Sequence, residues 1–347
     1  MNLKPKKVLI VKLNQLGDTV AFLPTIIALR KGWPTSHLTL LTTKIGEQLV
    51  QGSKLVDEVS VATIGEVKTL RGFLRWLRIV KRARFDMAVA SSDSSSFIAL
   101  LFFISQIPIR VGFTNPKLSF LYNQKISFSK DITHTKLNLR AAERFGLLAQ
   151  NTRPKIGIQI PEDDKRYILQ KLSKYGISKS DQFVVLHIGS NRPSRRWPTE
   201  QFAELVNLIV EKHSVKIICI GGSQEKKLVS SLQTLVIGKP IVDMTGETNI
   251  KQLIYLISLA ALFIGHSSGP LHIAYMMGTP TVSLWGASSL AIWGPVWEKE
   301  KHRCVKVDEL NCLYCEQDVC PKGTLECMKL ITAQQVYREV KESLQLS

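Results

Sequence analysis

The chain has 347 residues, of which 45% are hydrophobic and 21% are charged. This composition excludes an intrinsically disordered protein, and the length indicates two domains, each large enough to bury a full core. The formal net charge is +18, and residues 1–165 carry 25 Lys and Arg against 12 Asp and Glu. The first half is therefore expected to face an anionic partner, which could be nucleic acid, an anionic membrane surface or an acidic substrate.

The sequence shows neither a targeting segment nor a membrane span. The apolar run near the start is interrupted at Lys12, which is too early for the core of a signal peptide. The longest apolar stretch, residues 97–104, is far shorter than the roughly 20 residues that cross a bilayer. We therefore expect a cytoplasmic protein.

Short apolar, β-branched runs alternate with helical patterns in both halves of the chain, which predicts two α/β domains with parallel sheets. In the first half the predicted strands are residues 7–13, 38–42, 58–61, 86–90 and 107–113. In the second half they are residues 183–188, 216–220, 261–265 and 281–285. The segment 151–164 contains Pro154 and Pro161 and is typical of a domain connection, so we place the boundary at residue 160.

Asp18 follows the first predicted strand and is expected at the cap of a helix that runs to Arg30. The carboxyl end of a strand in an open parallel sheet is where ligands bind. Asp18 is then either a capping residue, worth about 1 kcal/mol, or a carboxylate that accepts a proton. The loop does not have the Gly-x-Gly-x-x-Gly spacing of a dinucleotide-binding motif.

Residues 67–84 predict one basic amphipathic helix that includes Trp76. Its apolar side is expected to hold Leu70, Phe73, Leu74, Leu77 and Val80. Such a helix either rests on anionic lipid head groups or is a surface helix whose basic side is simply solvated. Further along, Arg110 lies in the predicted strand 107–113, where a lone arginine is most often a structural partner.

Three loops of the second half, residues 189–196, 221–225 and 266–269, follow predicted strands and are expected to converge on one ligand. The first offers the cations Arg192, Arg195 and Arg196, and the second offers the carboxylate of Glu225. The third, His-Ser-Ser-Gly, precedes a helix with Pro270 at its first position, where unpaired backbone N–H groups bind phosphate. Taken alone, the third loop could also be a plain helix cap; together the loops suit a nucleotide diphosphate.

Four motifs then identify a resemblance that covers nearly the whole chain: VLIVKLNQLGDTVAFLPTIIALR, IRVGF, HIGSNRPSRRWPTEQFAEL and IGHSSGPLHIAYMMGTPTVSLWG. The chain resembles glycosyltransferase family nine, the lipopolysaccharide heptosyltransferases. The resemblance implies a GT-B fold, in which two Rossmann-like domains face each other across a cleft. Residues 1–160 would bind the acceptor and residues 161–347 the nucleotide-sugar donor. It also implies an inverting transfer of heptose from ADP-heptose to the lipopolysaccharide inner core, with no metal required for catalysis.

The resemblance also assigns roles to single residues. Asp18 matches the proposed general base, Arg195 the cation on the diphosphate and Glu225 the acidic residue on the ribose. The implied acceptor-binding residues are Lys12 and Arg110. The implied donor-binding set is completed by Ser190, Asn191, Ser267, Ser268, Gly269, Pro270 and His272. Ser267 departs from the family pattern, which commonly has an aspartate there, so the donor sugar is left open.

The basic first half gains a partner from this resemblance, because the acceptor carries Kdo carboxylates and lipid A phosphates at the inner membrane leaflet. We expect a cytoplasmic enzyme that is peripheral to the inner membrane and does not bind nucleic acid, since no nucleic-acid-binding motif is present. Two alternatives remain open: a transferase of the same family that uses another nucleotide sugar, and a catalytically silent nucleotide-sugar-binding protein.

Five cysteines fall within the 24 residues 304–327: Cys304, Cys312, Cys315, Cys320 and Cys327. In a cytosolic protein such a cluster indicates a metal site more than disulfides. Four thiolates could hold a structural zinc, but the spacing does not match a paired Cys-x-x-Cys pattern, and reduced, packed thiols are the alternative. Residues 332–346 predict a final helix, which we expect to pack back on the first domain.

Overall fold

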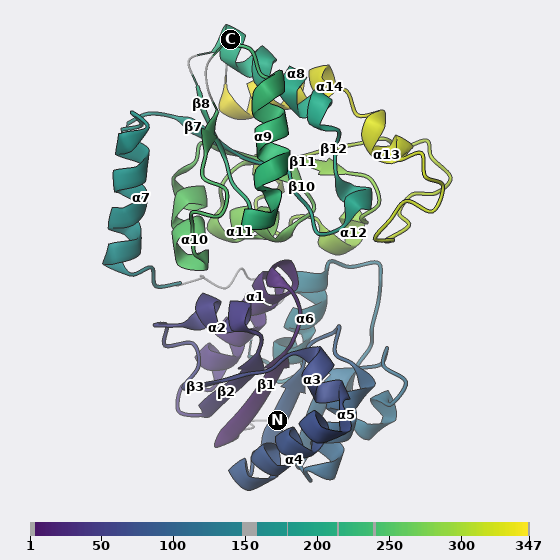
Figure 1. Ribbon diagram of the computed structural model, residues 1–347. Helices are drawn as coiled ribbons and strands as arrows, with labels where there is room; N and C mark the ends of the chain where they lie inside the picture. Colours follow the sequence, from purple (N-terminus) through teal and green to yellow (C-terminus); the bar gives the residue numbers. More distant parts are fainter. Residues whose placement is uncertain (1–3, 148–157, 179, 214, 239–240, 346–347) are drawn as a thin grey trace. The chain divides into compact units, whose positions relative to one another are not determined.

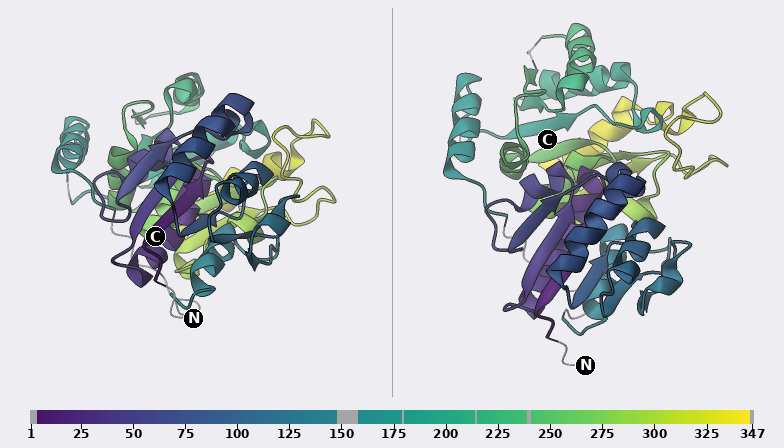
Figure 2. Two further views of the ribbon diagram at one scale, coloured as in Figure 1. Left: turned by 90° about the horizontal axis from the view of Figure 1, so that it is seen from below. Right: turned by 60° about the horizontal axis from the view of Figure 1, so that its bottom comes forward.

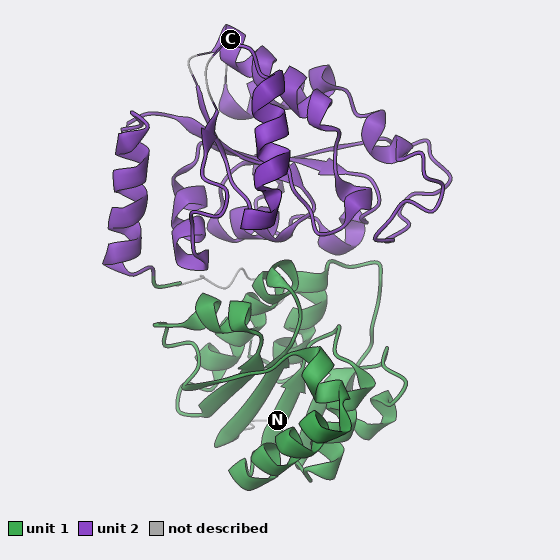
Figure 3. Ribbon diagram, viewed as in Figure 1, with its two compact units in different colours: residues 1–159 green, residues 160–347 purple. Residues whose placement is uncertain are grey.

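The computed structural model describes residues 4–147, 158–178, 180–213, 215–238 and 241–345. The chain divides into two compact units, Met1–Gln159 and Ile160–Ser347 (Figure 3). The division falls beside residue 160, where the proline-containing connection was expected. Among the described residues, no helix is both long and apolar enough to cross a membrane.

Unit 1 contains one parallel sheet of six strands in the order β3-β2-β1-β4-β5-β6 (Figure 1). The strands are β1 (Lys7–Lys12), β2 (His37–Thr42), β3 (Glu58–Val61), β4 (Met87–Ala90), β5 (Ile109–Phe113) and β6 (Gln124–Ile126). The five predicted strands form within two residues of the expected limits. β6 has three residues at the sheet edge and was not predicted, because so short a strand carries no periodic signal.

Helices cover the sheet of unit 1 (Figure 2). They are α1 (Leu16–Gly32), α2 (Lys44–Val50), α3 (Ile64–Lys68), α4 (Leu70–Ala83), α5 (Ser96–Ile104) and α6 (His134–Glu143). Trp76 of α4 and Phe102 of α5 pack in one buried cluster with Leu9 and Val11 of β1. α1 packs beside α6. The sheet is therefore buried by helices, as its continuous apolar strands require.

The single helix predicted for residues 67–84 is wrong, because Thr69 separates α3 from α4. The Thr69 hydroxyl accepts a hydrogen bond from the Gly72 N–H and donates one to the Glu66 carbonyl, so one side chain ends the first helix and caps the second. The predicted apolar side is also partly wrong: Trp76 is buried, whereas the side chains of Leu70 and Leu74 are 77% and 42% exposed.

Unit 2 repeats the architecture with a parallel sheet in the order β12-β11-β10-β7-β8-β9 (Figure 1). Its strands are β7 (Phe183–His187), β8 (Lys216–Cys219), β9 (Val242–Asp243), β10 (Leu262–His266), β11 (Thr281–Trp285) and β12 (His302–Lys306). Its helices are α7 (Glu162–Lys174), α8 (Thr199–Lys212), α9 (Lys226–Leu235), α10 (Ile250–Leu259), α11 (Gly269–Met277), α12 (Leu290–Trp293), α13 (Glu326–Lys329) and α14 (Ala333–Leu344). The four predicted strands form. The edge strands β9 and β12 were not predicted.

The final helix, α14, uses its apolar face within unit 2. Val336, Tyr337 and Val340 belong to the buried cluster that contains the strand residues of this unit. Just before the helix, the indole N–H of Trp197 donates to the Ile331 carbonyl at 2.9 Å. The core of unit 2 therefore takes up the apolar residues of this helix, and its packing on the first domain stays a prediction.

Candidate functional site

The strand orders of the two sheets place a switch point in each unit. In unit 1 the chain leaves the adjacent strands β1 and β4 in opposite directions, and in unit 2 it does so at β7 and β10. Ligands bind open parallel sheets at the carboxyl ends of such strands, where the diverging loops leave a crevice. The residues that follow these four strands are therefore the candidates for function.

In unit 1 the switch point gathers four ionisable side chains. Lys12 ends β1, Asp18 lies in the first turn of α1, Asp93 follows β4 and His134 begins α6. Asp18, Asp93 and His134 each offer a ligand atom within 4.8 Å of the others, and the Lys12 ammonium forms an ion pair with Asp93. Such a trio could hold a cation, but the Lys12 ammonium already supplies the positive charge.

The Lys12–Asp93 pair is buried. The Lys12 side chain is fully inaccessible to solvent, and Asp93 also accepts a hydrogen bond from the Ser91 hydroxyl at 2.6 Å. Burial alone would raise the pKa of Asp93, but Lys12 and then His134 outweigh it and hold the pKa below its ordinary value. Asp93 is therefore an ionised partner for a buried cation.

The pKa of Asp18 is shifted in the opposite direction to that of Asp93. Burial raises its pKa above the ordinary value; Lys12 opposes this, and the negative charge of Asp93 adds to it. Asp18 was expected at the helix cap, but the N-cap residue is Gln15 and Asp18 lies inside the first turn. A half-buried carboxylate with a raised pKa is suited to accept a proton.

His134 is held by a polar network. Its Nε2 lies 3.1 Å from the Ser92 hydroxyl, and the Ser92 N–H donates to the Asn138 side-chain carbonyl at 2.8 Å. Asn138 in turn donates to the His134 carbonyl at 2.8 Å. Burial lowers the pKa of His134, which favours the neutral imidazole.

The sequence analysis missed Asp93 and His134. The strand before Asp93 was predicted, but not that it pairs with β1, and only this pairing brings Asp93 beside Lys12. The polar stretch Ser-Ser-Asp directly after a buried strand was the available signal.

Arg110 lies in β5, beyond the switch point in the strand order. Its Nε and Nη1 donate to the carbonyl oxygens of Leu121 and Ile107 at 2.8 and 2.7 Å, and its guanidinium lies 5.6 Å from the centre of the Phe103 ring. These contacts favour the structural interpretation of this arginine.

In unit 2 the loops after β7 and β8 meet at Glu225. Its carboxylate accepts the Gly222 N–H at 2.8 Å and lies 3.5 Å from Nε2 of His187. Burial would raise the pKa of Glu225, but His187 and the Gly222 N–H outweigh it and lower the pKa. Gly189 is required here, because a Cβ atom at this position would lie 1.4 Å from the Glu225 carboxylate.

The β10–α11–β11 unit forms as the sequence predicted. Ser268 is the N-cap residue of α11, Gly269 and Pro270 open the helix, and Gly278 ends it in the left-handed conformation. The Ser268 hydroxyl lies 3.1 Å from Nδ1 of His187. This helix start therefore presents backbone N–H groups at the switch point of unit 2, which is the arrangement that binds phosphate.

Arg195 reaches the loop before α11. Its guanidinium donates to the Ser267 carbonyl at 3.3 Å and to the Glu316 carboxylate at 3.1 Å. Arg196 donates to the Ser190 carbonyl at 2.7 and 2.9 Å, so Ser190 shapes the loop through its backbone.

Three other predicted donor residues differ in their surroundings. Asn191 is exposed, and the His272 ring packs near the rings of Tyr275 and Trp293. Ser267 is almost completely buried, and its hydroxyl has no hydrogen-bond partner among the described residues.

The structure separates Cys304 from the other four cysteines. Cys304 lies in β12, with its sulfur 3.6 Å from the Ser283 hydroxyl. The pKa of the Cys327 thiol is raised to about 11, first by burial and then by the nearby thiols of Cys315, Cys312 and Cys320. These four cysteines are here called the thiol cluster; Cys312, Cys315 and Cys320 lie in the loop that follows β12, and Cys327 lies in α13.

The family model for glycosyltransferase family 9 (heptosyltransferase) matches residues 73–325. Lipopolysaccharide heptosyltransferase 3 of Escherichia coli K12 is 23% identical over 294 residues, which cover 80% of this chain and 82% of that protein.

Two solved structures have the same fold. The glycosyl transferase family 9 structure from Veillonella parvula has a TM-score of 0.85 and 21% identity, and covers 100% of this chain and 99% of its own. E. coli ADP-heptose lps heptosyltransferase II has a TM-score of 0.77 and 20% identity, and covers 98% of each chain.

Two parallel sheets of this topology form the GT-B fold. The family match extends over most of the chain. The protein belongs to glycosyltransferase family 9, the heptosyltransferase family.

We predict that Asp93→Asn lowers the free energy of unfolding by about 3 kcal/mol, because it leaves the buried Lys12 ammonium without its partner. The pKa of Asp93 is lower in the folded chain, so its ionised form contributes stability above the unfolded pKa. That contribution is lost as the pH falls through the folded pKa. Urea titrations of both proteins at neutral and acidic pH measure the difference.

The control is Asp131→Asn, at an exposed position of the same unit, which should change the free energy of unfolding by less than about 0.5 kcal/mol. Equal stability of Asp93→Asn and the unmodified protein would contradict the prediction.

Proposed function

We propose that the protein transfers heptose from ADP-heptose to the inner core of lipopolysaccharide. The main support for this proposal is the state of Asp18. Its half-buried carboxyl group has a raised pKa and lies beside Lys12 and Asp93 at the unit 1 switch point. The names of relatives support the substrates, since one is a lipopolysaccharide heptosyltransferase and another an ADP-heptose heptosyltransferase. Asp18 is the general base in this proposal. Lys12, whose side chain is inaccessible to solvent, does not fit the acceptor-binding role expected for it and acts on Asp18 through its charge.

In the reaction, an acceptor hydroxyl attacks the anomeric carbon of the heptose and inverts its configuration. Asp18 takes the hydroxyl proton as the new carbon–oxygen bond forms. The bond from the anomeric carbon to the phosphate oxygen breaks, and its electron pair leaves with ADP.

Unit 2 supplies the groups that bind the donor. The Arg195 guanidinium and the backbone N–H groups at the start of α11 stabilise the negative charge that develops on the departing diphosphate. Glu225, ionised because its pKa is lowered, accepts hydrogen bonds from the ribose hydroxyls. These fixed positive groups act in place of a metal ion, so we propose that catalysis requires no metal.

Asp18→Asn is expected to lower the transfer rate at least about a hundredfold, because an amide cannot accept the hydroxyl proton. The dissociation constant for ADP should not change, since the nucleotide binds to unit 2. Transfer from ADP-heptose to a Kdo-containing acceptor is measured with and without EDTA, and ADP binding is measured by calorimetry. Asp131→Asn again serves as the control, with the unmodified rate.

Full activity of Asp18→Asn would remove Asp18 from the mechanism. Loss of activity in EDTA at an unchanged unfolding temperature would contradict the metal-independent reaction, because removal of a structural metal ion would lower that temperature. Tighter binding of UDP or GDP than of ADP would assign another nucleotide sugar, and binding of none of the three would favour a catalytically silent protein.

We further propose that the enzyme works in the cytoplasm and contacts the anionic inner leaflet of the membrane through unit 1. α4 packs beside α5, and α5 beside the short helical turn Ser119–Leu121. These three elements carry the large apolar side chains that unit 1 leaves exposed in this region: Leu70, Leu74, Ile79, Phe97, Phe103, Ile104 and Phe120.

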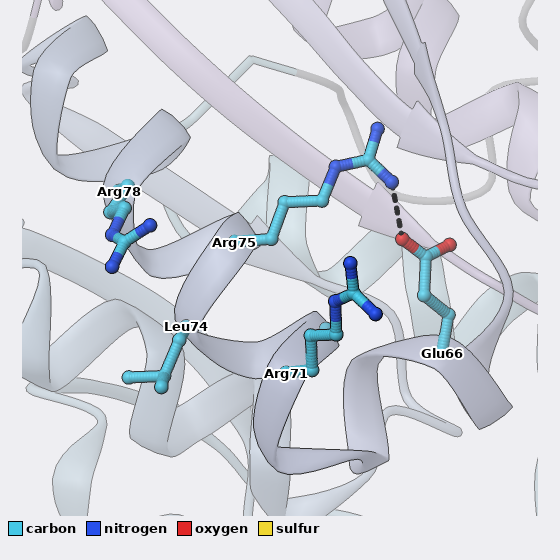
Figure 4. Close-up of a pocket in the computed structure, with 6 residues that line it drawn as sticks. Glu66, Arg71, Leu74, Arg75 and Arg78 are labelled. Atoms are coloured by element: carbon cyan, nitrogen blue, oxygen red, sulfur yellow. Dashed lines mark hydrogen bonds and ion pairs between the residues drawn. The ribbon is translucent and has the colours of Figure 1, made fainter.

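Arginines adjoin this apolar surface. Figure 4 shows Arg71, Arg75 and Arg78 around a pocket that Leu74 also lines, and only Arg75 is drawn paired, with Glu66 at 2.8 Å. Exposed apolar side chains next to arginines fit the boundary between the acyl chains and anionic head groups of a membrane. A basic surface also attracts the phosphates of the acceptor.

Replacing Leu70 and Leu74 by serine should weaken binding to phosphatidylglycerol-containing vesicles by at least about tenfold, because two leucines no longer enter the acyl region. Co-sedimentation measures binding, with phosphatidylcholine vesicles for comparison. Ile237→Ser, in unit 2 and 79% exposed, is the control and should bind as the unmodified chain does. Equal binding of the double variant would exclude this surface.

We propose that the thiol cluster holds a structural zinc ion. Four thiolates satisfy the tetrahedral coordination of zinc, and the loop between Lys306 and Glu326 has neither helix nor strand, so it can adjust around an ion. Among the described residues, only the Asp18 group brings three ligand atoms within 4.8 Å of one another. Binding would therefore draw the four sulfurs together. The alternative is a set of reduced, packed thiols.

The purified protein should contain about one zinc ion per chain, as should a Cys304→Ser variant, because Cys304 lies outside the thiol cluster. Cys315→Ser should lose the metal and unfold at a lower temperature, since metal binding stabilises the folded loop. Elemental analysis identifies and counts the metal. Metal-free protein that takes up no zinc on reconstitution would favour packed thiols, and another metal in its place would correct the assignment to zinc.

A further inference from the structure

A short acidic segment of unit 2, residues 316–318 with the sequence Glu-Gln-Asp, is here called the acidic strap. The strap lies in the loop after β12, and it contacts the loop after β7 that carries Arg195. The Ser194 N–H donates to the Asp318 carbonyl at 3.1 Å, and the Ser194 hydroxyl donates to the Gln317 carbonyl at 2.5 Å. Two backbone carbonyls therefore fix the strap against the arginine loop.

Both neighbouring arginines also bind the strap. The Arg192 Nε lies 2.9 Å from the Asp318 carboxylate, and its Nη1 donates to the Glu316 carbonyl at 3.3 Å. Nη2 of Arg195 donates to one oxygen of the Glu316 carboxylate at 3.1 Å. The strap thus pairs with two of the three arginines of this loop, while Arg196 binds the Ser190 carbonyl.

Glu316 connects this loop to a third one. The second oxygen of its carboxylate accepts the Ser289 N–H at 2.7 Å, and the Glu316 N–H donates to the Ala287 carbonyl at 2.9 Å. Ala287 and Ser289 follow β11, which lies beside β10 in the sheet. One residue therefore ties together the loops that follow β7, β11 and β12, at the edge of the sheet where α11 begins.

The backbone of Glu316 has a φ of 53°, in the left-handed region that residues with a side chain disfavour. The hydrogen bonds to Ala287 and Arg192 hold it there. In this conformation the Glu316 carboxylate points toward Arg195. A carboxylate fixes the plane of a guanidinium through charge-assisted hydrogen bonds. Arg195 stays cationic in the pair, because a guanidinium is not deprotonated in proteins.

We propose that Glu316 is a positioning residue, which holds Arg195 in the orientation that binds the diphosphate of the donor. This inference rests on the proposed binding of a nucleotide diphosphate by unit 2. A guanidinium that is already oriented loses less conformational entropy when the ligand binds. The free energy of binding is therefore more favourable.

Glu316→Gln tests the proposal, because glutamine keeps the shape of the side chain and removes its charge. The variant should bind ADP about tenfold more weakly by calorimetry, which corresponds to about 1.4 kcal/mol, and should raise the KM for the donor. Its unfolding temperature should stay close to that of the unmodified protein. Glu309→Gln, at an exposed position of the same loop, is the matched control and should bind ADP normally.

A double-mutant cycle shows whether Glu316 acts through Arg195. In an Arg195→Ala background, Glu316→Gln should cause no further loss of ADP affinity, because the group that Glu316 orients is absent. Equal losses in both backgrounds would show a general structural effect and overturn the proposal. Unchanged or tighter ADP binding by Glu316→Gln would also overturn it, and tighter binding would show that the carboxylate competes with the diphosphate.

These outcomes are distinct from failure of the proposed function. If the unmodified protein binds neither ADP nor another nucleoside diphosphate, the donor assignment is wrong and the positioning role falls with it. If the unmodified protein binds ADP, and the losses of ADP affinity caused by Glu316→Gln and Arg195→Ala simply add, only the role of Glu316 is wrong.

Discussion

The strand order is the constraint on which both candidate sites depend. In each sheet two adjacent strands, β1 with β4 and β7 with β10, send their loops in opposite directions. Parallel strands bury their backbone and apolar side chains, so polar groups can collect only where the strands end. Lys12 and Asp93 come together for this reason in unit 1, and the Arg195 loop meets the start of α11 for the same reason in unit 2.

Burial then decides what each charge can do. Lys12 is fully buried and needs a carboxylate partner, which Asp93 provides. Asp93 stays ionised for this purpose, and its negative charge helps to raise the pKa of the neighbouring Asp18. The pKa values of two carboxyl groups in one cluster are thus shifted in opposite directions. The lowered pKa lets Asp93 compensate a cation, and the raised pKa suits Asp18 to accept a proton, which is the pattern expected of an acid–base site.

The sequence predicted the parts of the fold that local chemistry determines. β-branched runs marked nine strands, and the Ser-Gly-Pro and Gly-Thr-Pro punctuation marked both ends of α11. The prediction failed at Thr69, where a side-chain cap divides a helical pattern that looked continuous. Asp93 and Glu316 were missed because only strand order and loop packing bring them to Lys12 and Arg195, and no local pattern encodes either.

The structure also bears on Ser267, where the resemblance leads one to expect an aspartate. Arg195 binds the backbone carbonyl of residue 267 and not its side chain, so this contact does not depend on the residue type. The N–H groups at the start of α11 are likewise backbone groups. Arg195 has its carboxylate partner in Glu316, from another loop. The serine therefore leaves the proposed phosphate-binding elements of unit 2 intact, so the departure from the family pattern does not by itself remove the proposed donor site.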